Sequence, residues 1–183
     1  KKGYGNLNYI NNVTAFVDAE SISDYAKEAI SDLPPVKEGE TVTAYVDLPN
    51  NNYQILMRGD NKIITSHFCG NYGEKIRTVI QNVKQGQGKN DFNKLIEDGE
   101  IDVRFKLTSG FPNTYGRLIE DQPCTTITNN MTTPSGLRCI HYEQDRALTP
   151  REGAGVAFDL CPAGIRNLKN VYALRVAGHL ADD

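Results

Sequence analysis

Cysteine and histidine lie two residues apart at two places in this sequence, and cysteine hydrolases are built from such a pair. The pairs are His67 with Cys69, and Cys139 with His141. In a hydrolase the histidine deprotonates the thiol, and a third group orients the histidine. On a strand, however, side chains at this spacing stand about 7 Å apart along one face, which is too far for a direct hydrogen bond. We therefore expect no catalytic residue here. A cysteine-dependent enzyme is less favoured than the structural protein and the binding module to which the rest of the sequence points.

The four cysteines predict disulfide bonds rather than a metal or redox site. They are Cys69, Cys124, Cys139 and Cys161, an even number with wide spacing and no Cys-x-x-Cys motif. Three pairings are possible, and we favour Cys124–Cys139 and Cys69–Cys161. Bridges that close loops of this size stabilise a fold by about 3–4 kcal/mol each when they are unstrained. They form outside the reducing cytosol.

Other short motifs suggest turns rather than binding sites. Asp47 and Asp60 lie in Asn-rich segments that could offer oxygen ligands to calcium, but neither segment fits the EF-hand spacing. The integrin-type tripeptide Arg58-Gly59-Asp60 coincides with a tight-turn signal. No histidine pattern or glycine-rich loop matches a metal or phosphate motif. We expect neither a metal nor a cofactor.

Composition indicates one ordinary globular domain over residues 1–183. Hydrophobic residues make up 39% of the chain and charged residues 23%, and the net charge is −3. This charge gives no reason to expect a nucleic-acid partner. No run of about 18 apolar residues is present, so we expect no membrane span. The first residues, Lys1-Lys2-Gly3, are polar, so an export signal would lie outside the sequence.

Two Asn-x-Thr triplets support an extracellular or cell-surface location. Asn12 and Asn130 occupy the acceptor positions for N-glycosylation. Together with the even number of cysteines, they favour a secreted protein.

The elements that would position these residues begin with a helix. Apolar residues recur at helical spacing over residues 13–33, and Pro34-Pro35 ends the pattern. The period then changes to two over residues 41–48, 53–58 and 62–68, which predicts a three-stranded antiparallel meander.

Later segments alternate between the two patterns. Helices are predicted over residues 74–85 and 90–99. Strands are predicted over residues 100–108, 137–142, 155–161 and 171–177, and residues 109–135 form a long loop. The predicted fold class is α+β, with an N-terminal helix packed on an antiparallel β-sheet and a disulfide-stapled, loop-rich C-terminal half.

The order of the first elements resembles the ectodomains of archaeal type IV pilin-like proteins. A helix is followed in residues 40–64 by a strand that ends in Leu48-Pro49 and then by a hairpin, and residues 2–9 are similar to the family's processing motif. The resemblance implies a filament subunit that self-assembles at the cell surface. The assembly surface would be the apolar face of the first helix, formed by Phe16, Ile22, Tyr25, Ala29 and Ile30.

The sequence thus predicts a secreted or cell-surface structural or adhesive protein that is not an enzyme. Its partners would be further copies of itself or another surface protein or glycan. The alternative is an extracellular binding module of lectin or receptor-ligand type. In that case Asn113, Tyr115 and Arg117 of the 109–135 loop would contact the target.

Overall fold

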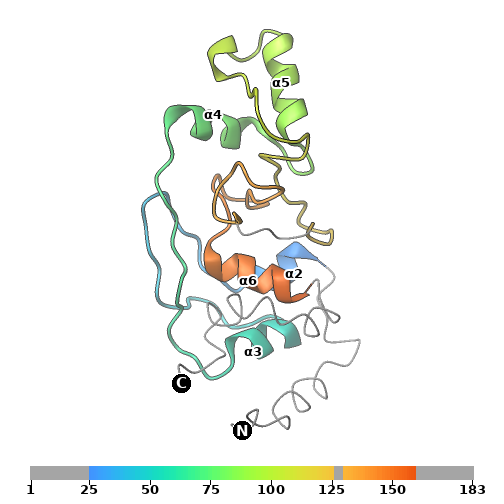
Figure 1. The fold of residues 1–183 in the computed structure, drawn as a ribbon. Helices are drawn as coiled ribbons and strands as arrows, with labels where there is room; N and C mark the ends of the chain where they lie inside the picture. The colour runs from blue at the N-terminus through green and yellow to red at the C-terminus, as the bar shows by residue number, and fades with distance from the viewer. Residues whose placement is uncertain (1–24, 126–129, 160–183) are drawn as a thin grey trace, which may run out of the picture.

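The structure is a computed structural model, and it describes residues 25–125 and 130–159. Long irregular segments connect short helices (Figure 1). In chain order these are α2 (Ala26–Ile30), α3 (Asn52–Arg58), α4 (Glu74–Asn82), α5 (Lys89–Glu97), the 3-10 helix η2 (Val103–Phe105) and α6 (Pro150–Asp159). Within the described ranges the backbone forms isolated β-bridges but no strand.

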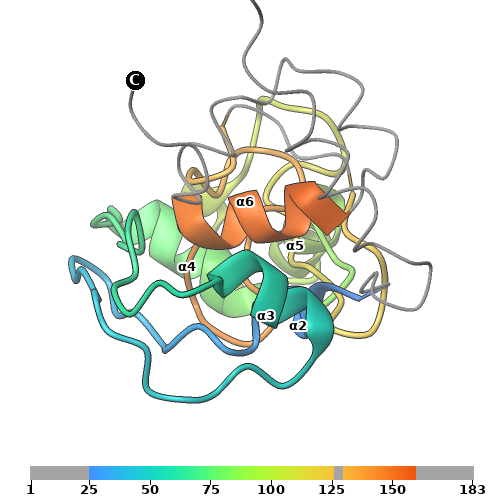
Figure 2. The same ribbon diagram turned by 90° about the horizontal axis from the view of Figure 1, so that it is seen from below.

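Helices α2, α3 and α6 pack together around one hydrophobic cluster (Figures 1 and 2). The helices approach closely because α6 carries glycine at the contact. A Cβ atom on Gly155 would lie 3.1 Å from Cγ2 of Ile30 in α2. The hydroxyl of Tyr53 in α3 donates a hydrogen bond to the carbonyl oxygen of the same glycine. The three helices therefore meet at Gly155.

Helices α4 and α5 pack with η2 around a second hydrophobic cluster, at the other end of the molecule in Figure 1. Its buried members are Val79, Val83, Phe92, Ile96, Phe105 and Leu107. The Asn93 amide fastens α5 to the segment after η2, since it accepts from the Leu107 N–H and donates to the Leu107 carbonyl, both at 2.9 Å. The predicted helices over residues 74–85 and 90–99 are confirmed within a few residues.

The predicted meander is wrong because its middle segment is helical. Residues 41–48 and 62–68 run antiparallel, but they share only two bridges, Thr41 with Phe68 and Ala44 with Ile63. The segment between them forms α3, which begins where the Asn51 side chain accepts the Gln54 N–H at 2.8 Å.

The burial pattern within α3 explains the error. Tyr53 and Met57 are buried while Ile55 is exposed, so the apolar residues follow a period near four rather than two. Gly59, with φ of 53°, ends the helix and is not a hairpin tip.

Three further predicted strands are also wrong. Residues 155–159 belong to α6, and residues 100–108 contain η2, where Asp102 accepts the Arg104 N–H at 2.9 Å. In the 137–142 segment only Ile140 forms bridges, to Arg117 and Ala147. The predicted strand over 171–177 and the part of the predicted 13–33 helix before residue 25 lie outside the described residues. Within the described residues that helix is confirmed only over α2, Ala26–Ile30. An α+β fold with an antiparallel sheet is therefore contradicted.

The predicted disulfide staples are contradicted as well. No disulfide joins Cys69, Cys124 and Cys139, all of which are buried, and Cys161 lies outside the described residues. Cys124 belongs to the hydrophobic cluster of α2, α3 and α6. A buried thiol packs as a small hydrophobic side chain, so an even number of cysteines does not by itself indicate bridges.

Candidate functional site

Helix α6 begins with a capping box that the sequence carries as Thr149-Pro150-Arg151-Glu152. The Thr149 N–H donates to Oε2 of Glu152 at 2.9 Å, and the Glu152 N–H donates to Oγ1 of Thr149 at 3.1 Å. Pro150 occupies the first helical position, where its missing N–H costs nothing. The carboxylate that caps the helix is thereby placed inside the protein, with 1% of its residue surface exposed.

Arg146 forms a buried bidentate ion pair with Glu152. Its Nη1 and Nη2 each lie 2.6 Å from a carboxylate oxygen of Glu152. The two side chains are 2% and 1% exposed. Burial alone would raise the pKa of Glu152, but the hydrogen bonds and charge of Arg146 outweigh it and hold that pKa well below its usual range. Glu152 is therefore a carboxylate at neutral pH.

His67 connects the start of α6 to the segment after α2. Its Nε2 lies 2.8 Å from the Pro34 carbonyl oxygen, and its Nδ1 lies 2.9 Å from Oγ1 of Thr149. Because a carbonyl oxygen can only accept, the proton sits on Nε2, and Nδ1 accepts from the threonine hydroxyl. Burial lowers the pKa of His67, so the ring is neutral and both nitrogens are in use.

His141 is held in the same tautomer beside Glu152. Its Nδ1 accepts the backbone N–H groups of Glu143 and Gln144, both at 3.0 Å. Its Nε2 then faces Oε1 of Glu152 at 3.7 Å. Burial lowers the pKa of His141 to about 4, although the Glu152 charge opposes this. Neither described histidine has a ring nitrogen directed at a cysteine.

Arg117 joins the α4 end of the molecule to the loop that precedes Arg146. Its Nε and Nη2 donate to carbonyl oxygens in the last turn of α4 and just after it, where a cation is favoured by the helix dipole. Its Nη1 and Nη2 also reach the 141–145 loop. The five partners are Ile80 O, Val83 O, His141 O, Gln144 O and Oδ1 of Asp145, at 2.6–3.1 Å.

The Cys139 thiol is not activated, and the Cys69 thiol is occupied by contacts within the protein. Sγ of Cys69 donates to the Gly70 carbonyl oxygen at 3.3 Å and lies 3.3 Å from the Tyr72 hydroxyl. Burial raises the pKa of Cys139 to about 11. A nucleophilic cysteine needs the opposite shift, which a nearby cation or helix N-terminus supplies. These two thiols therefore act as packed side chains.

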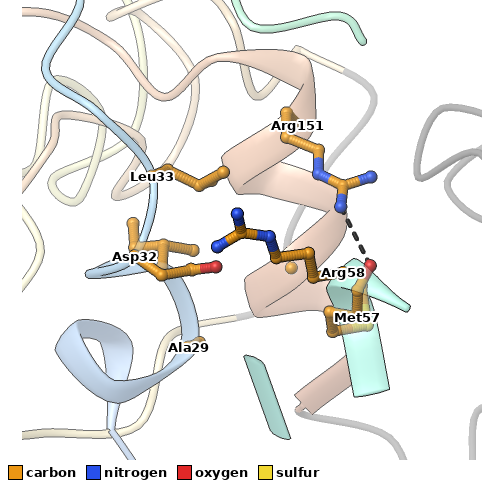
Figure 3. A pocket seen from close by; sticks show the side chains of 8 residues that line it. Ala29, Asp32, Leu33, Met57, Arg58 and Arg151 are labelled. Atoms are coloured by element: carbon orange, nitrogen blue, oxygen red, sulfur yellow. Dashed lines mark hydrogen bonds between the residues drawn. The ribbon is translucent and has the colours of Figure 1, made fainter. Parts of the chain in front are cut away.

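A pocket between α2, α3 and α6 contains a buried acid beside two arginines (Figure 3). Asp32 is 5% exposed. Burial raises its pKa, against the effect of its own backbone N–H and of the Arg151 and Arg58 charges. A buried acid with a perturbed pKa in a cleft is a candidate functional group.

Both arginines of the pocket are also tied to the protein. Arg151 donates to the Met57 carbonyl oxygen at 2.9 Å and to the Tyr45 hydroxyl at 3.1 Å. Arg58 lies 3.7 Å above the Tyr45 ring. Because Arg58 ends α3 and Gly59 caps that helix, the integrin-type tripeptide is not displayed on a hairpin. The cavity volume is about 10 Å³, which suits about one water molecule. In this conformation the pocket does not admit a substrate.

The residues predicted as an assembly surface are split between core and surface. Ala29 and Ile30 are buried in the cluster that joins α2 to α6, whereas Tyr25 is 41% exposed. Phe16 and Ile22 lie outside the described residues.

The predicted binding-loop residues do not form one surface. Asn113 is exposed, Tyr115 is half-buried, and Arg117 is buried in the network above. Of the predicted glycosylation sites, Asn130 is exposed and Asn12 lies outside the described residues.

The described ranges contain neither a cluster of metal ligands nor a membrane-spanning helix. Over residues 25–125 and 130–159, no three His, Cys, Asp or Glu side chains are grouped so that they could hold a metal ion. No helix in that part of the chain has the length and apolar character needed to cross a bilayer.

Comparison with known proteins relates the chain to methyltransferases. Over 101 residues, 55% of this chain, it is 31% identical to the type II methyltransferase M1.HphI of Haemophilus parahaemolyticus, of which the match covers 23%. Over 145 residues, 70% of this chain, it is 28% identical to DNA (cytosine-5)-methyltransferase 4 of Arabidopsis thaliana, of which the match covers 10%. The chain thus spans less than a quarter of either relative. No protein-family model matches it.

This likeness to two enzymes contradicts the prediction that the protein is not an enzyme. The two relatives are named as methyltransferases, not as secreted or pilin-like proteins. The adhesive role, the alternative binding-module role and the extracellular location stay predictions.

Proposed function

We propose that this chain is part of a DNA (cytosine-5)-methyltransferase, in which it supports contact with DNA. The observation that carries the proposal is the similarity to two methyltransferases from a bacterium and a plant, one of them named for DNA cytosine.

The geometry supports a positioning role rather than the transfer step. The Cys139 thiol has a raised pKa, and the His67 and His141 rings are neutral with their nitrogens engaged within the protein. The cavity beside Asp32 suits about one water molecule. Because the chain spans less than a quarter of either relative, the remaining parts of a longer protein would supply the groups that transfer the methyl group.

The buried network provides a rigid base for exposed loops. Arg117 fixes the end of the 109–117 segment against α4, and the Arg146–Glu152 pair fixes the 138–149 segment against α6. Binding groups commonly lie on loops held by such a base. The net charge of −3 gives no general attraction for polyanions, so contact with DNA would be local. This proposal replaces the expectation that nucleic acid is not a partner.

Fluorescence anisotropy of a labelled cytosine-containing DNA duplex, titrated with the full 183-residue chain, tests the proposal. We expect binding in the range of about 1–100 µM at low salt that weakens as salt is added. Heparin of similar charge is the control, and it should bind more weakly. No anisotropy change with DNA, or equal binding to heparin, would contradict the proposal.

A second measurement separates binding from chemistry. The chain alone, incubated with the duplex and a radiolabelled methyl donor, should transfer no label. Transfer by the chain alone would show that the proposed division between positioning and chemistry is wrong.

A further inference from the structure

Phe111 is an aromatic side chain displayed on a built turn. It is 77% exposed, although burying a phenyl ring away from water is energetically favourable. It lies in the segment that leads from η2 to Arg117, where that segment contacts the start of α5. Single exposed apolar residues are common, so the backbone beneath Phe111 is what sets it apart.

The turn beneath Phe111 is closed by Thr114. The Thr114 N–H and Oγ1 both donate to the Phe111 carbonyl oxygen, at 3.0 and 2.7 Å. Gly110 precedes the turn with φ of 92°, in the region that favours glycine, and a Cβ there would lie 2.7 Å from Oγ1 of Thr114. The turn conformation therefore depends on these two residues.

The start of α5 holds the same turn from the other side. The Lys89 N–H donates to the Thr114 carbonyl oxygen at 2.9 Å, and Nζ of Lys89 donates to the Gly110 carbonyl oxygen at 2.8 Å. A Cβ on Gly88 would lie 3.1 Å from the Pro112 carbonyl oxygen, so a side chain there would displace that carbonyl by a few tenths of an ångström. The turn is thus fixed to a helix that belongs to a hydrophobic cluster.

A ring presented in this way suits stacking on a nucleobase. Little backbone or side-chain freedom is lost when a rigidly held aromatic group binds a planar partner. Every base has a π-face, so stacking does not require a particular sequence. Enzymes that modify a base act on one taken out of the duplex stack, which leaves unstacked faces for such a ring.

The charge beside the ring fits the same partner. Nζ of Lys89 uses one of its three N–H donors on Gly110 and keeps two for a phosphate oxygen. A protein partner that bound the Phe111 ring in an apolar pocket would not need the Lys89 ammonium group beside the turn.

We propose that Phe111 stacks on an unstacked base of bound DNA, with Lys89 placed to contact the backbone phosphate. This inference rests on the proposed function, because it assumes that the chain contacts DNA. It adds which residue meets the bases.

The test compares F111A, F111W and V103A in the full chain. Val103 is the matched control, since it is 70% exposed in η2 but is not aromatic. Anisotropy gives the affinity for the duplex, and a 2-aminopurine base in the duplex reports unstacking by its fluorescence. Thermal melting, followed by circular dichroism, checks that each variant is folded.

We expect F111A to bind DNA roughly tenfold more weakly and to lose the 2-aminopurine rise, since stacking contributes about that factor per base. F111W should keep both signals, and V103A should match the original chain. Overturning results are a folded F111A that binds and unstacks DNA like the original chain, or V103A losing as much as F111A. If F111A instead changes self-association with unchanged DNA affinity, the ring serves a protein contact and the inference is wrong. Failure of the original chain to bind DNA would refute the proposed function itself, so the two failures are distinguishable.

Discussion

Replacing Glu152 with glutamine would leave the Arg146 guanidinium group buried without an opposite charge. The glutamine side chain has the same shape, so the packing at the start of α6 is kept. One of its two terminal groups, however, would present N–H donors to the N–H donors of Arg146. The perturbation therefore isolates the charge and the second acceptor.

The expected loss follows from the burial of the pair. The two side chains are 2% and 1% exposed, and both contacts are 2.6 Å long. Removing one partner of such a pair costs about 3–5 kcal/mol. The whole free energy of unfolding of a domain is about 5–15 kcal/mol, so E152Q should be close to unfolding. The surface pair Lys27–Glu120, with side chains 57% and 42% exposed, provides the control, and E120Q should cost less than about 1 kcal/mol.

Urea denaturation of the full chain, followed by circular dichroism, measures these differences as shifts in midpoint at constant slope. The double variant R146M/E152L adds a sharper comparison, because it removes both charges and replaces them with apolar groups. We expect it to lose less stability than either single substitution. A loss below about 1 kcal/mol for E152Q, or a double variant that loses the sum of the two single losses, would refute the role assigned to the pair.

Two further predictions concern the same network. Burial lowers the pKa of folded His141 to about 4 from 6.5, so the unfolded chain binds more protons between those values and stability falls as pH falls through that window. Between about pH 7.5 and about pH 5, His141 alone should lower the free energy of unfolding by about 2 kcal/mol, at 1.36 kcal/mol per pKa unit. Urea denaturation at several pH values measures this change. If the free energy of unfolding of H141N depends on pH just as steeply, another group causes the effect. R117K keeps the charge but cannot serve five acceptors, so it should cost about 2 kcal/mol or more, whereas R104K at a side chain 61% exposed should stay within about 0.5 kcal/mol. Equal losses in the two lysine variants would contradict the joining role of Arg117.

The helices that the sequence predicts correctly are those with a clear apolar period and a glycine at the boundary. In α4 the buried Val79 and Ile80, with Val83 just after the helix, repeat at helical spacing. In α5 Phe92 and Ile96 do the same, and Gly99 adopts a positive φ just after its end. The helices that these local patterns predict form in the structure because the same residues pack in the second hydrophobic cluster.

Strands were wrongly predicted where apolar and polar residues alternate without forming a buried face and an exposed face. Between residues 100 and 108, Phe105 and Leu107 are buried but Val103 is 70% exposed, so the alternation does not mark one face. Propensity toward strand is realised only when a neighbouring strand pairs with it. Without such a neighbour, the segment forms η2 and packs against α4 and α5.

The candidate site could have been found in part from the sequence. Thr149-Pro150-Arg151-Glu152 has threonine, proline and glutamate at the cap, first and third positions of a helix, which is a recognised start signal. The glycines that follow at positions 153 and 155 masked this signal, because glycine is unfavourable in helices. The partners His67 and Arg117 could not be predicted, since long-range packing brings them to the site, and no local pattern marks Arg146, six residues before Glu152, as the partner of that carboxylate.

The five hydrogen bonds of Arg117 bear on how the protein opens. One arginine ties carbonyl oxygens of α4 to the loop before α6, so separating the two clusters would expose a guanidinium group and several carbonyl groups at once. Amide protons in the two clusters should consequently exchange with solvent through a shared opening event, at similar rates, rather than as two independent foldons.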